Sequence, residues 1–178
     1  MNEFLKKIGL LDHMIIELLI RQSDFVDTLQ ANVDPKKVGL FEAFSSSKNM
    51  YKGSVSYDGF EIRRKKKIFE TTLNLTKATG KISQLGEKLI VNIEVNGFHW
   101  LTIVFVAMIA SFYAIFIAIS LTVDIGDVMF VIPVLLVHAL FMLGIPYIAL
   151  RRGLTTTKYN LERDIHFMMK DKVRANQC

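Results

Sequence analysis

The 178-residue sequence has a single cysteine and lacks the short motifs that mark common enzymes. Because Cys178 stands alone, an intrachain disulfide and a Cys-x-x-Cys site are excluded, and the composition fits a reducing compartment. No two of the four histidines stand at metal-ligand spacing on one helix face, and Gly-x-Ser-x-Gly, His-Glu-x-x-His and phosphate-loop patterns are absent. We therefore predict a protein that is not an enzyme, with no catalytic residues, no metal site and no cofactor.

Lysine and arginine are absent from positions 101 to 150, where two long apolar runs take up most of the sequence. The runs cover 101–121 and 128–150, and each has about the 20 residues that cross a hydrocarbon core of roughly 30 Å. Between them, Asp124 and Asp127 are the only charged side chains. We predict a transmembrane hairpin over 99–150, with its spans at these two runs.

The 22 lysines and arginines flank this hairpin, with 15 before Trp100 and 7 from Arg151 onward. Because positive residues close to a span stay on the cytoplasmic side, Arg151 and Arg152 indicate that both termini are cytoplasmic. The net charge of +5 favours anionic lipid headgroups as partners. Nucleic acid is not expected, because no aromatic-rich strand of the RNA-binding type lies beside the basic residues.

Residues 1–50 are predicted to form a helical segment followed by a linker. Apolar residues recur at helical spacing over 4–33, which indicates two helices or one bent helix, with Ser23 or Asp24 as the cap of the second. We expect the apolar faces of these helices to cover a neighbouring sheet. Alternatively, residues 1–20 lie in the headgroup plane as an interfacial helix, because two lysines stand beside apolar side chains there.

Residues 51–98 change to a spacing of two, which is typical of β-strands. The Asp58-Gly59 pair favours a tight hairpin, and 88–95 is the most strongly β-patterned segment of the chain. A further strand is expected where Phe69, Thr71, Leu73 and Leu75 alternate with polar residues.

The predicted fold is therefore an α+β membrane protein. Its N-terminal helices pack on a small antiparallel β-meander, or partly open barrel, of about four or five strands, so that 1–50 and 51–98 form one cytosolic unit. The transmembrane hairpin follows this unit. Apolar residues at helical spacing then predict an amphipathic C-terminal helix over 151–178, which lies against the cytosolic unit or the bilayer.

Five consecutive basic residues are the sharpest charge feature of the sequence: Arg63, Arg64, Lys65, Lys66 and Lys67. In a regular strand, Arg63, Lys65 and Lys67 share one face, and Arg64 and Lys66 share the other. Two interpretations stay open. Either the residues form a solvated edge strand that charge protects from aggregation, or they bind anionic lipid headgroups or a phosphate-bearing small ligand.

Three small residues, Ala110, Ala114 and Ala118, share one face of the first span at a spacing of four. Such a stripe favours close helix packing. We expect it to pack on the second span, with Gly144 as a contact, or to join protomers in a homo-oligomer.

The second span contains His138, an intramembrane ionisable residue of a kind that often marks function. We expect a neutral imidazole that is hydrogen-bonded to Ser111, to Tyr113 or to a backbone carbonyl group. The alternative is a functional role for this side chain inside the membrane.

The order of the segments resembles a known plan. Tyr51-Lys52-Gly53-Ser54-Val55 and Gly59-Phe60-Glu61-Ile62-Arg63-Arg64 are followed by a strand and a two-helix membrane hairpin. In this plan, the chain resembles uncharacterised small bacterial membrane proteins with a PH-like or short β-barrel cytosolic domain. More distantly, it resembles the two-span β-barrel effectors of bacterial antiphage defence, in which a cytosolic barrel binds a cyclic nucleotide and the spans oligomerise to damage the inner membrane. The resemblance implies a location in the bacterial inner membrane.

From these features we predict a membrane-anchored, non-enzymatic binding or scaffold protein with a cytosolic α+β module. Its partners are the lipid bilayer and anionic headgroups. The alternative is a ligand-gated effector of bacterial defence, which uses the basic cluster as a phosphate site for a ligand of cyclic-nucleotide type. In that case, the spans oligomerise to disrupt the inner membrane.

Overall fold

The computed structural model describes residues 2–35, 49–65, 76–122 and 128–177 of the chain. The chain divides into two compact units. The first, which we call the α+β unit, comprises Met1–Gly97 and Leu150–Cys178. The second, which we call the apolar unit, comprises Phe98–Ala149.

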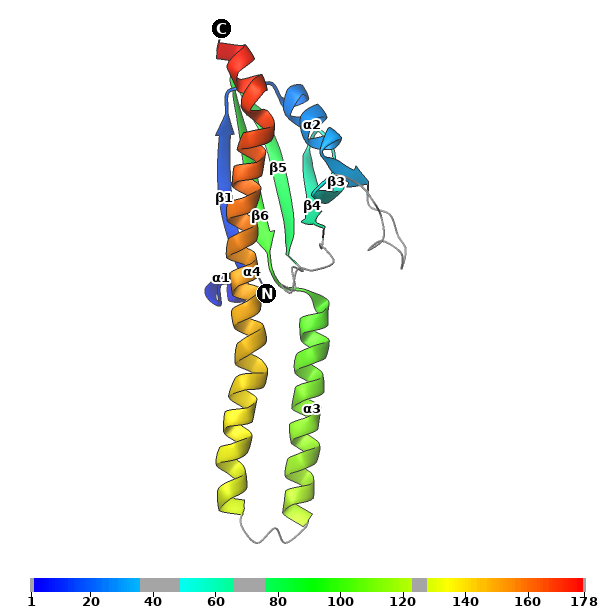
Figure 1. Cartoon of the computed structure of the whole chain (residues 1–178), viewed down its shortest axis with the longest axis vertical. Coiled ribbons are helices and arrows are strands. Elements are labelled where there is room, and N and C mark those ends of the chain that lie inside the picture. The colour runs from blue at the N-terminus through cyan, green and yellow to red at the C-terminus, as the bar shows by residue number, and fades with distance from the viewer. Residues whose placement is uncertain (1, 36–48, 66–75, 123–127, 178) are drawn as a thin grey trace. The chain divides into compact units, whose positions relative to one another are not determined.

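A six-stranded sheet forms the framework of the α+β unit (Figure 1). Its strands are β1 (Leu11–Leu18), β2 (Val33–Pro35), β3 (Tyr51–Val55), β4 (Gly59–Arg64), β5 (Lys77–Leu85) and β6 (Lys88–Asn96). Their order across the sheet is β1-β6-β5-β4-β3-β2. Neighbouring strands are antiparallel except β2 and β3, which are parallel, so the sheet is mixed.

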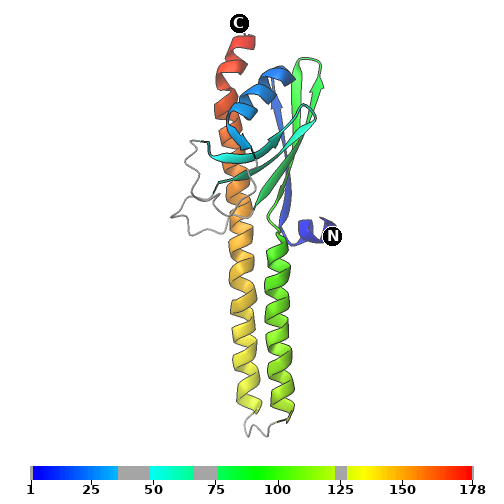
Figure 2. The ribbon, with the colours of Figure 1, turned by 90° about the vertical axis from the view of Figure 1, so that its right-hand side faces the viewer.

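The helices of this unit are α1 (Asn2–Lys7), α2 (Gln22–Ala31) and the part of α4 (Val128–Gln177) from Leu150 onward. In Figures 1 and 2, α2 and this part of α4 lie over one face of the sheet, which we call the inner face. The core lies between them and the strands, and its most buried side chains include Phe25, Leu29, Ile62, Val91, Ile93, Leu161, Ile165 and Met169.

Residues 11–18, which lie within the predicted helical region, form the strand β1, so this part of the prediction was wrong. β1 pairs with β6 along its whole length, from Leu11 opposite Asn96 to Leu18 opposite Leu89. Its buried residues alternate with exposed ones, and Ile15 is 65% exposed. Positions 11, 15 and 18 fit a helical period, but long-range pairing with β6 imposes the period of two.

The second predicted helix is confirmed as α2, which buries Phe25, Val26 and Leu29 against the sheet. Its N-cap is Arg21 rather than Ser23 or Asp24, and no side chain caps it. The helix therefore begins earlier than the capping residues indicated.

The predicted meander is present as the antiparallel strands β3, β4, β5 and β6. The Asp58-Gly59 pair stands at the turn between β3 and β4, and Gly86, with a φ of +62°, lies in the turn between β5 and β6. The strand expected over 69–75 falls outside the described residues. β1 and β2 extend the meander on its two sides, which makes the sheet larger than predicted and mixed.

The apolar unit consists of α3 (Trp100–Thr122) and the part of α4 up to Ala149, which lie side by side in Figures 1 and 2. Both helices are long and apolar enough to cross a membrane, and no residue in the most apolar stretch of either is buried. α4 runs without a break through Pro133 and Pro146. The predicted C-terminal helix is thus the continuation of the second apolar helix, and it packs against the sheet.

Candidate anion-binding surface

The outer face of the sheet carries basic residues on three neighbouring strands. Lys52 of β3 stands opposite Arg63 of β4, and Arg63 stands opposite Lys77 of β5. Residues directly opposite each other in antiparallel strands share a face, with their β-carbons about 5 Å apart. We call Lys52, Arg63 and Lys77 the basic row.

Two carboxylates lie beside the basic row. Lys77 Nζ is 2.7 Å from Glu61 Oε2 on the neighbouring strand. Lys65 Nζ forms an ion pair with Asp34, the residue of β2 that stands beside Lys52. Arg63 has no ion-pair partner within the described part of the chain. Its guanidinium group is therefore available to an anion.

The structure describes three of the five consecutive basic residues of the sequence, and these three have different surroundings. Arg63 lies in the basic row, Lys65 is paired with a carboxylate, and Arg64 stands opposite the buried tyrosine of β3 on the inner face. Lys66 and Lys67 lie outside the described residues. The alternation predicted for this strand therefore separates Arg63 from Arg64.

Sequence reasoning missed Lys52 and Lys77 as members of the candidate surface. The hairpin predicted at Asp58-Gly59 was sufficient to identify Lys52, because a tight turn there brings Lys52 opposite Arg63. Lys77 has no comparable local signal, since residues 65–76 separate it from β4 in the chain.

The basic row lies at the end of the sheet from which the chain enters α3. Lys77 stands opposite Asn96, the last residue of β6. Residues 97–99 separate Asn96 from Trp100, the first residue of α3. A chain of four residues spans at most about 14 Å. The basic row thus lies at the end of the sheet from which a short connection leads to α3.

Helix α1 lies at the same end of the sheet. The Gly97 N–H donates a 2.9 Å hydrogen bond to the Leu10 carbonyl group, so the segment after α1 runs beside the end of β6. α1 buries one leucine and exposes Phe4, Lys6 and Lys7. This short helix therefore adds two cations and an exposed aromatic ring.

Arg151 of α4 adds a further positive charge at this end. A β-carbon built on Gly9, which follows α1, would lie 3.4 Å from Arg151 Nε, so the guanidinium group lies against this turn. We use the name basic rim for Lys6, Lys7, Lys52, Arg63, Lys77 and Arg151.

A buried polar pair attaches α4 to β3. The Tyr51 hydroxyl group donates a 2.8 Å hydrogen bond to Asp164 Oδ2, and both side chains are buried. Asp164 Oδ1 accepts hydrogen bonds from Arg163 Nη2 and Nε at 3.0 and 3.2 Å. Burial, followed by the hydrogen bond to the carboxylate and its charge, raises the pKa of Tyr51 far above its usual value of 10.0. The phenol thus stays protonated and serves as a donor.

A second polar pair attaches α4 to β1. Lys158 Nζ lies 2.7 Å from Asp12 Oδ2 and 3.2 Å from the His13 carbonyl oxygen. Partial burial raises the pKa of Asp12, but hydrogen bonds from Lys158 and from the His13 N–H outweigh it and lower the pKa below 3.8. α4 is thus tied to the sheet at two places by charged groups.

In the apolar unit, Tyr113 Oη lies 2.7 Å from His138 Nδ1. Tyr113 is therefore the partner of His138 among the three that the sequence suggested. The hydrogen bond joins α3 to α4 and satisfies two polar side chains within an apolar surrounding.

The alanine stripe does not pack on α4. Ala110, Ala114 and Ala118 are exposed, and a β-carbon built on Gly144 would meet nothing within 4 Å. The expected contact with Gly144 is thus missing, because the half-buried face of α3 is a different one. That face carries Phe105, Ile109, Tyr113, Phe116 and Ser120.

Within residues 2–35, 49–65, 76–122 and 128–177, no group of three or more histidine, cysteine or acidic side chains is placed to hold a metal ion. Comparisons with protein families, with curated proteins and with solved structures found no match for this chain.

Proposed function

We propose that the protein is a membrane-anchored, non-enzymatic binding protein whose apolar unit spans the bilayer twice. The exposure of the apolar unit carries this proposal, since side chains such as Ile115 and Leu140 are 61% and 72% exposed. Soluble monomers rarely expose contiguous apolar patches larger than a few hundred Å². Helices suit lipid because they satisfy their own backbone groups, and the bond between Tyr113 and His138 pairs two polar side chains there.

The charges flanking the apolar unit favour one orientation. Lysine and arginine are absent between positions 101 and 150, and Arg151 and Arg152 follow directly. By the positive-inside rule, both termini and the α+β unit are cytoplasmic, and only the turn that contains Asp124 and Asp127 faces outward. The resemblance noted above gives the bacterial inner membrane as the location.

The basic rim supplies the binding surface of the proposal. It lies at the end of the sheet where the chain enters α3, so anionic headgroups are its nearest anions once α3 is in the bilayer. A basic residue close to an anionic membrane contributes about 1 kcal/mol. Exposed Phe4, beside the two lysines of α1, fits the headgroup boundary.

The topology is tested with the single native cysteine. Cys178 is expected to react with a membrane-impermeant maleimide only after cells are permeabilised. In a Cys178→Ser background, Asp124→Cys is expected to react from outside in intact cells. Release of the full chain by alkaline carbonate, or the reverse labelling pattern, would refute the proposed anchoring.

The headgroup site is tested with the single tryptophan. Trp100 begins α3 and is 61% exposed, so energy transfer from it to dansyl-labelled lipids reports the local lipid composition. We expect more transfer to labelled phosphatidylglycerol than to labelled phosphatidylethanolamine in mixed vesicles. The double variant Lys7→Glu and Arg63→Glu should lower this preference by about twofold or more.

A matched control has the same charge change at the other end of the sheet. Lys170→Glu with Arg174→Glu reverses two exposed charges of α4 and should leave the lipid preference unchanged. Equal transfer to both lipids in the wild type, or equal loss in the two double variants, would contradict the headgroup site.

A ligand-gated effector that assembles through its helices is the second candidate. The exposed stripe of Ala110, Ala114 and Ala118 favours it, because small residues on an unpaired helix face suit close contact with another copy. Vesicles that contain the protein should then leak only after a cyclic nucleotide is added. Intact vesicles with every cyclic nucleotide tested would leave the anchored binding protein as the function.

A further inference from the structure

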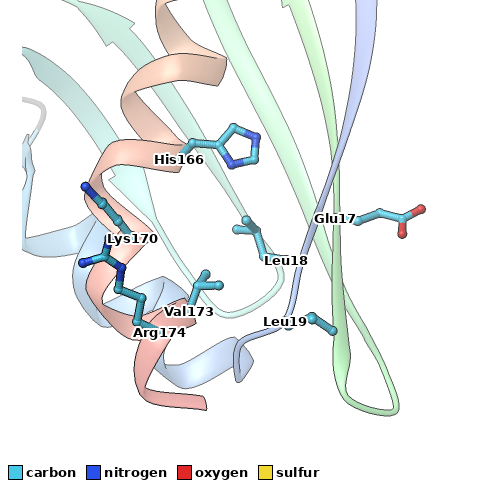
Figure 3. A pocket seen from close by; sticks show the side chains of 7 residues that line it. All are labelled: Glu17, Leu18, Leu19, His166, Lys170, Val173 and Arg174. Carbon is cyan, nitrogen blue, oxygen red and sulfur yellow. The ribbon is translucent and has the colours of Figure 1, made fainter. Parts of the chain in front are cut away.

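An open groove of about 410 Å³ lies between β1 and the last turns of α4, within the α+β unit (Figure 3). It lies at the end of β1 where Leu18 stands opposite Leu89, whereas the basic rim lies at the end where Leu11 stands opposite Asn96. Its walls are formed by Glu17, Leu18, Leu19, His166, Lys170, Val173 and Arg174. The groove is therefore a separate surface from the basic rim.

One wall of the groove is the free edge of the sheet. Among the strands of the described residues, β1 is the outermost on its side and pairs only with β6. Because the Leu10 carbonyl group accepts from Gly97 beside β6, the even-numbered residues of β1 direct their backbone groups toward β6. The odd-numbered residues direct theirs toward the free edge.

This edge is occupied at one end and open at the other. The His13 N–H donates to Asp12 Oδ1 at 2.7 Å, and its carbonyl group accepts from Lys158 at 3.2 Å. For Ile15 and Glu17, no hydrogen bond to the outward backbone groups occurs within the described residues. Two N–H and two C=O groups are thus available for pairing with an added strand.

The other wall of the groove carries the positive charges of Lys170 and Arg174. His166, Lys170 and Arg174 recur every four residues on α4, and all three are exposed. Lys170 and Arg174 have no ion-pair partner within the described part of the chain. In Figure 3, Glu17 points to the side of β1 away from these residues. Its Oε2 atom lies 3.6 Å from Lys88 Nζ.

The spacing of the charged wall suits an extended peptide. Residues four apart on a helix are about 6 Å apart along its axis, and alternate residues of a strand are about 6.7 Å apart. β1 and this part of α4 run alongside each other in Figure 1. Acidic residues at every second position of an added strand would therefore lie opposite the successive basic residues of α4. The basic residues at this spacing begin at His166, because the residue one turn before it on α4 is Glu162.

We infer that this groove binds an extended acidic segment of a partner protein, which adds to β1 as a seventh strand. Backbone groups of the segment pair with those of Ile15 and Glu17. Its acidic side chains face Lys170 and Arg174, and the apolar side chains between them lie beside Ile15, which is 65% exposed on the outer face. The partner is thus recognised by alternating acidic and apolar residues.

The test uses the full-length protein in nanodiscs of zwitterionic lipid and a fluorescein-labelled eight-residue peptide of alternating glutamate and valine. Fluorescence anisotropy is expected to show saturable binding. Lys170→Glu with Arg174→Glu should weaken it roughly tenfold or more, because two attractive charges become repulsive. Ile15→Pro should also weaken it, because proline removes an outward N–H without removing a bond to β6.

Three matched controls separate edge pairing from general charge attraction. A peptide of alternating lysine and valine should not bind, and neither should the glutamate peptide with N-methylated valines. The rim variant Lys7→Glu with Arg63→Glu should bind as the wild type does, although it carries the same charge change as the groove variant.

The inference is wrong if the N-methylated peptide binds equally well, or if the groove and rim variants bind the peptide alike. It is also wrong if the protein forms dimers that exclude the peptide and that Ile15→Pro abolishes, since the edge would then pair with a second copy. If Ile15→Pro does not fold, as judged by circular dichroism, the groove variant and the N-methylated peptide decide the outcome.

Discussion

The hydrogen bond between Tyr51 and Asp164 gives the clearest quantitative prediction of the structure. Tyr51 is 2% exposed and Asp164 is 7% exposed, and their oxygen atoms are 2.8 Å apart. The pair joins β3, which carries Lys52 of the basic row, to the part of α4 that covers the inner face. Replacing Tyr51 with phenylalanine removes one oxygen atom and keeps the ring that packs in the core.

The expected cost follows from what the substitution leaves behind. Asp164 Oδ2 would remain buried without its donor, while Oδ1 keeps its two bonds from Arg163. A buried acceptor without a partner costs about 1 to 3 kcal/mol, and hydrogen bonds to charged groups contribute about 1.5 to 3 kcal/mol. We therefore expect Tyr51→Phe to lower the free energy of unfolding by about 2 kcal/mol. For a chain of this length, this corresponds to roughly 4 to 8 °C in Tm.

The assay is thermal unfolding of the full-length protein in detergent, followed by circular dichroism. Tyr57→Phe is the matched control, because Tyr57 is 58% exposed and its hydroxyl group should contribute nothing measurable. A double-mutant cycle with Asp164→Ala should give a coupling energy of about 1.5 kcal/mol or more. A Tm unchanged by Tyr51→Phe, together with a coupling energy near zero, would show that water satisfies the pair and would refute the reasoning.

Three further predictions concern the same unit. Gly59→Ala should lower the free energy of unfolding by about 1 to 3 kcal/mol, because the added carbon would lie 2.2 Å from a carbonyl oxygen of β5. Gly144→Ala is the control and should have no such cost in the same thermal assay, because its added carbon would meet nothing within 4 Å. The pKa of Asp12 is lowered, so its ion pair with Lys158 stabilises the fold above pH 3.8, and this stabilisation is lost as the pH falls further. The stabilisation is below about 1 kcal/mol, because both groups are partly exposed. The Asp12→Asn variant should lack this pH-dependent loss of stability when it is unfolded by acid. The pKa of Tyr51 is raised, so its contribution is complete below pH 10.0 and declines above it, and alkaline unfolding should show a smaller decline in Tyr51→Phe.

Local patterns in the sequence were sufficient for the elements that depend on neighbouring residues. α2 follows from the spacing of Phe25, Val26 and Leu29, and β3, β4 and β6 follow from alternation and from the turn residues. The hairpin at Asp58-Gly59 needs only a few residues on each side. For such elements, the interactions that form the structure lie within the segment that shows the pattern.

β1 could not be predicted in this way. Its sequence places apolar residues at positions that fit both a helix and a strand, and the choice is made by β6, which is far from it in the chain. The parallel pairing of β2 with β3 is of the same kind, because only three residues of β2 take part. Without the edge strand β1, the groove beside α4 could not be predicted either.

The candidate surface shows the same limit. The run of five basic residues predicted an anion site, but the strand separates Arg63 from Arg64, and Asp34 neutralises Lys65. The basic row instead takes one residue from each of three strands. Only the register of the sheet brings Lys52 and Lys77 beside Arg63.

The two charged surfaces of the α+β unit lie at opposite ends of the sheet, and this separation predicts that they act independently. β1 extends from the rim end at Leu11 to the groove end at Leu18, seven steps of about 3.3 Å, or roughly 23 Å. The Debye length at physiological ionic strength is about 8 Å, so charges at one end are largely screened from the other. A charge reversal in the rim should therefore change lipid preference without changing peptide binding, and a reversal in the groove should do the opposite. Under the proposed function, anionic lipid at the rim therefore leaves the free edge of β1 open to a partner protein.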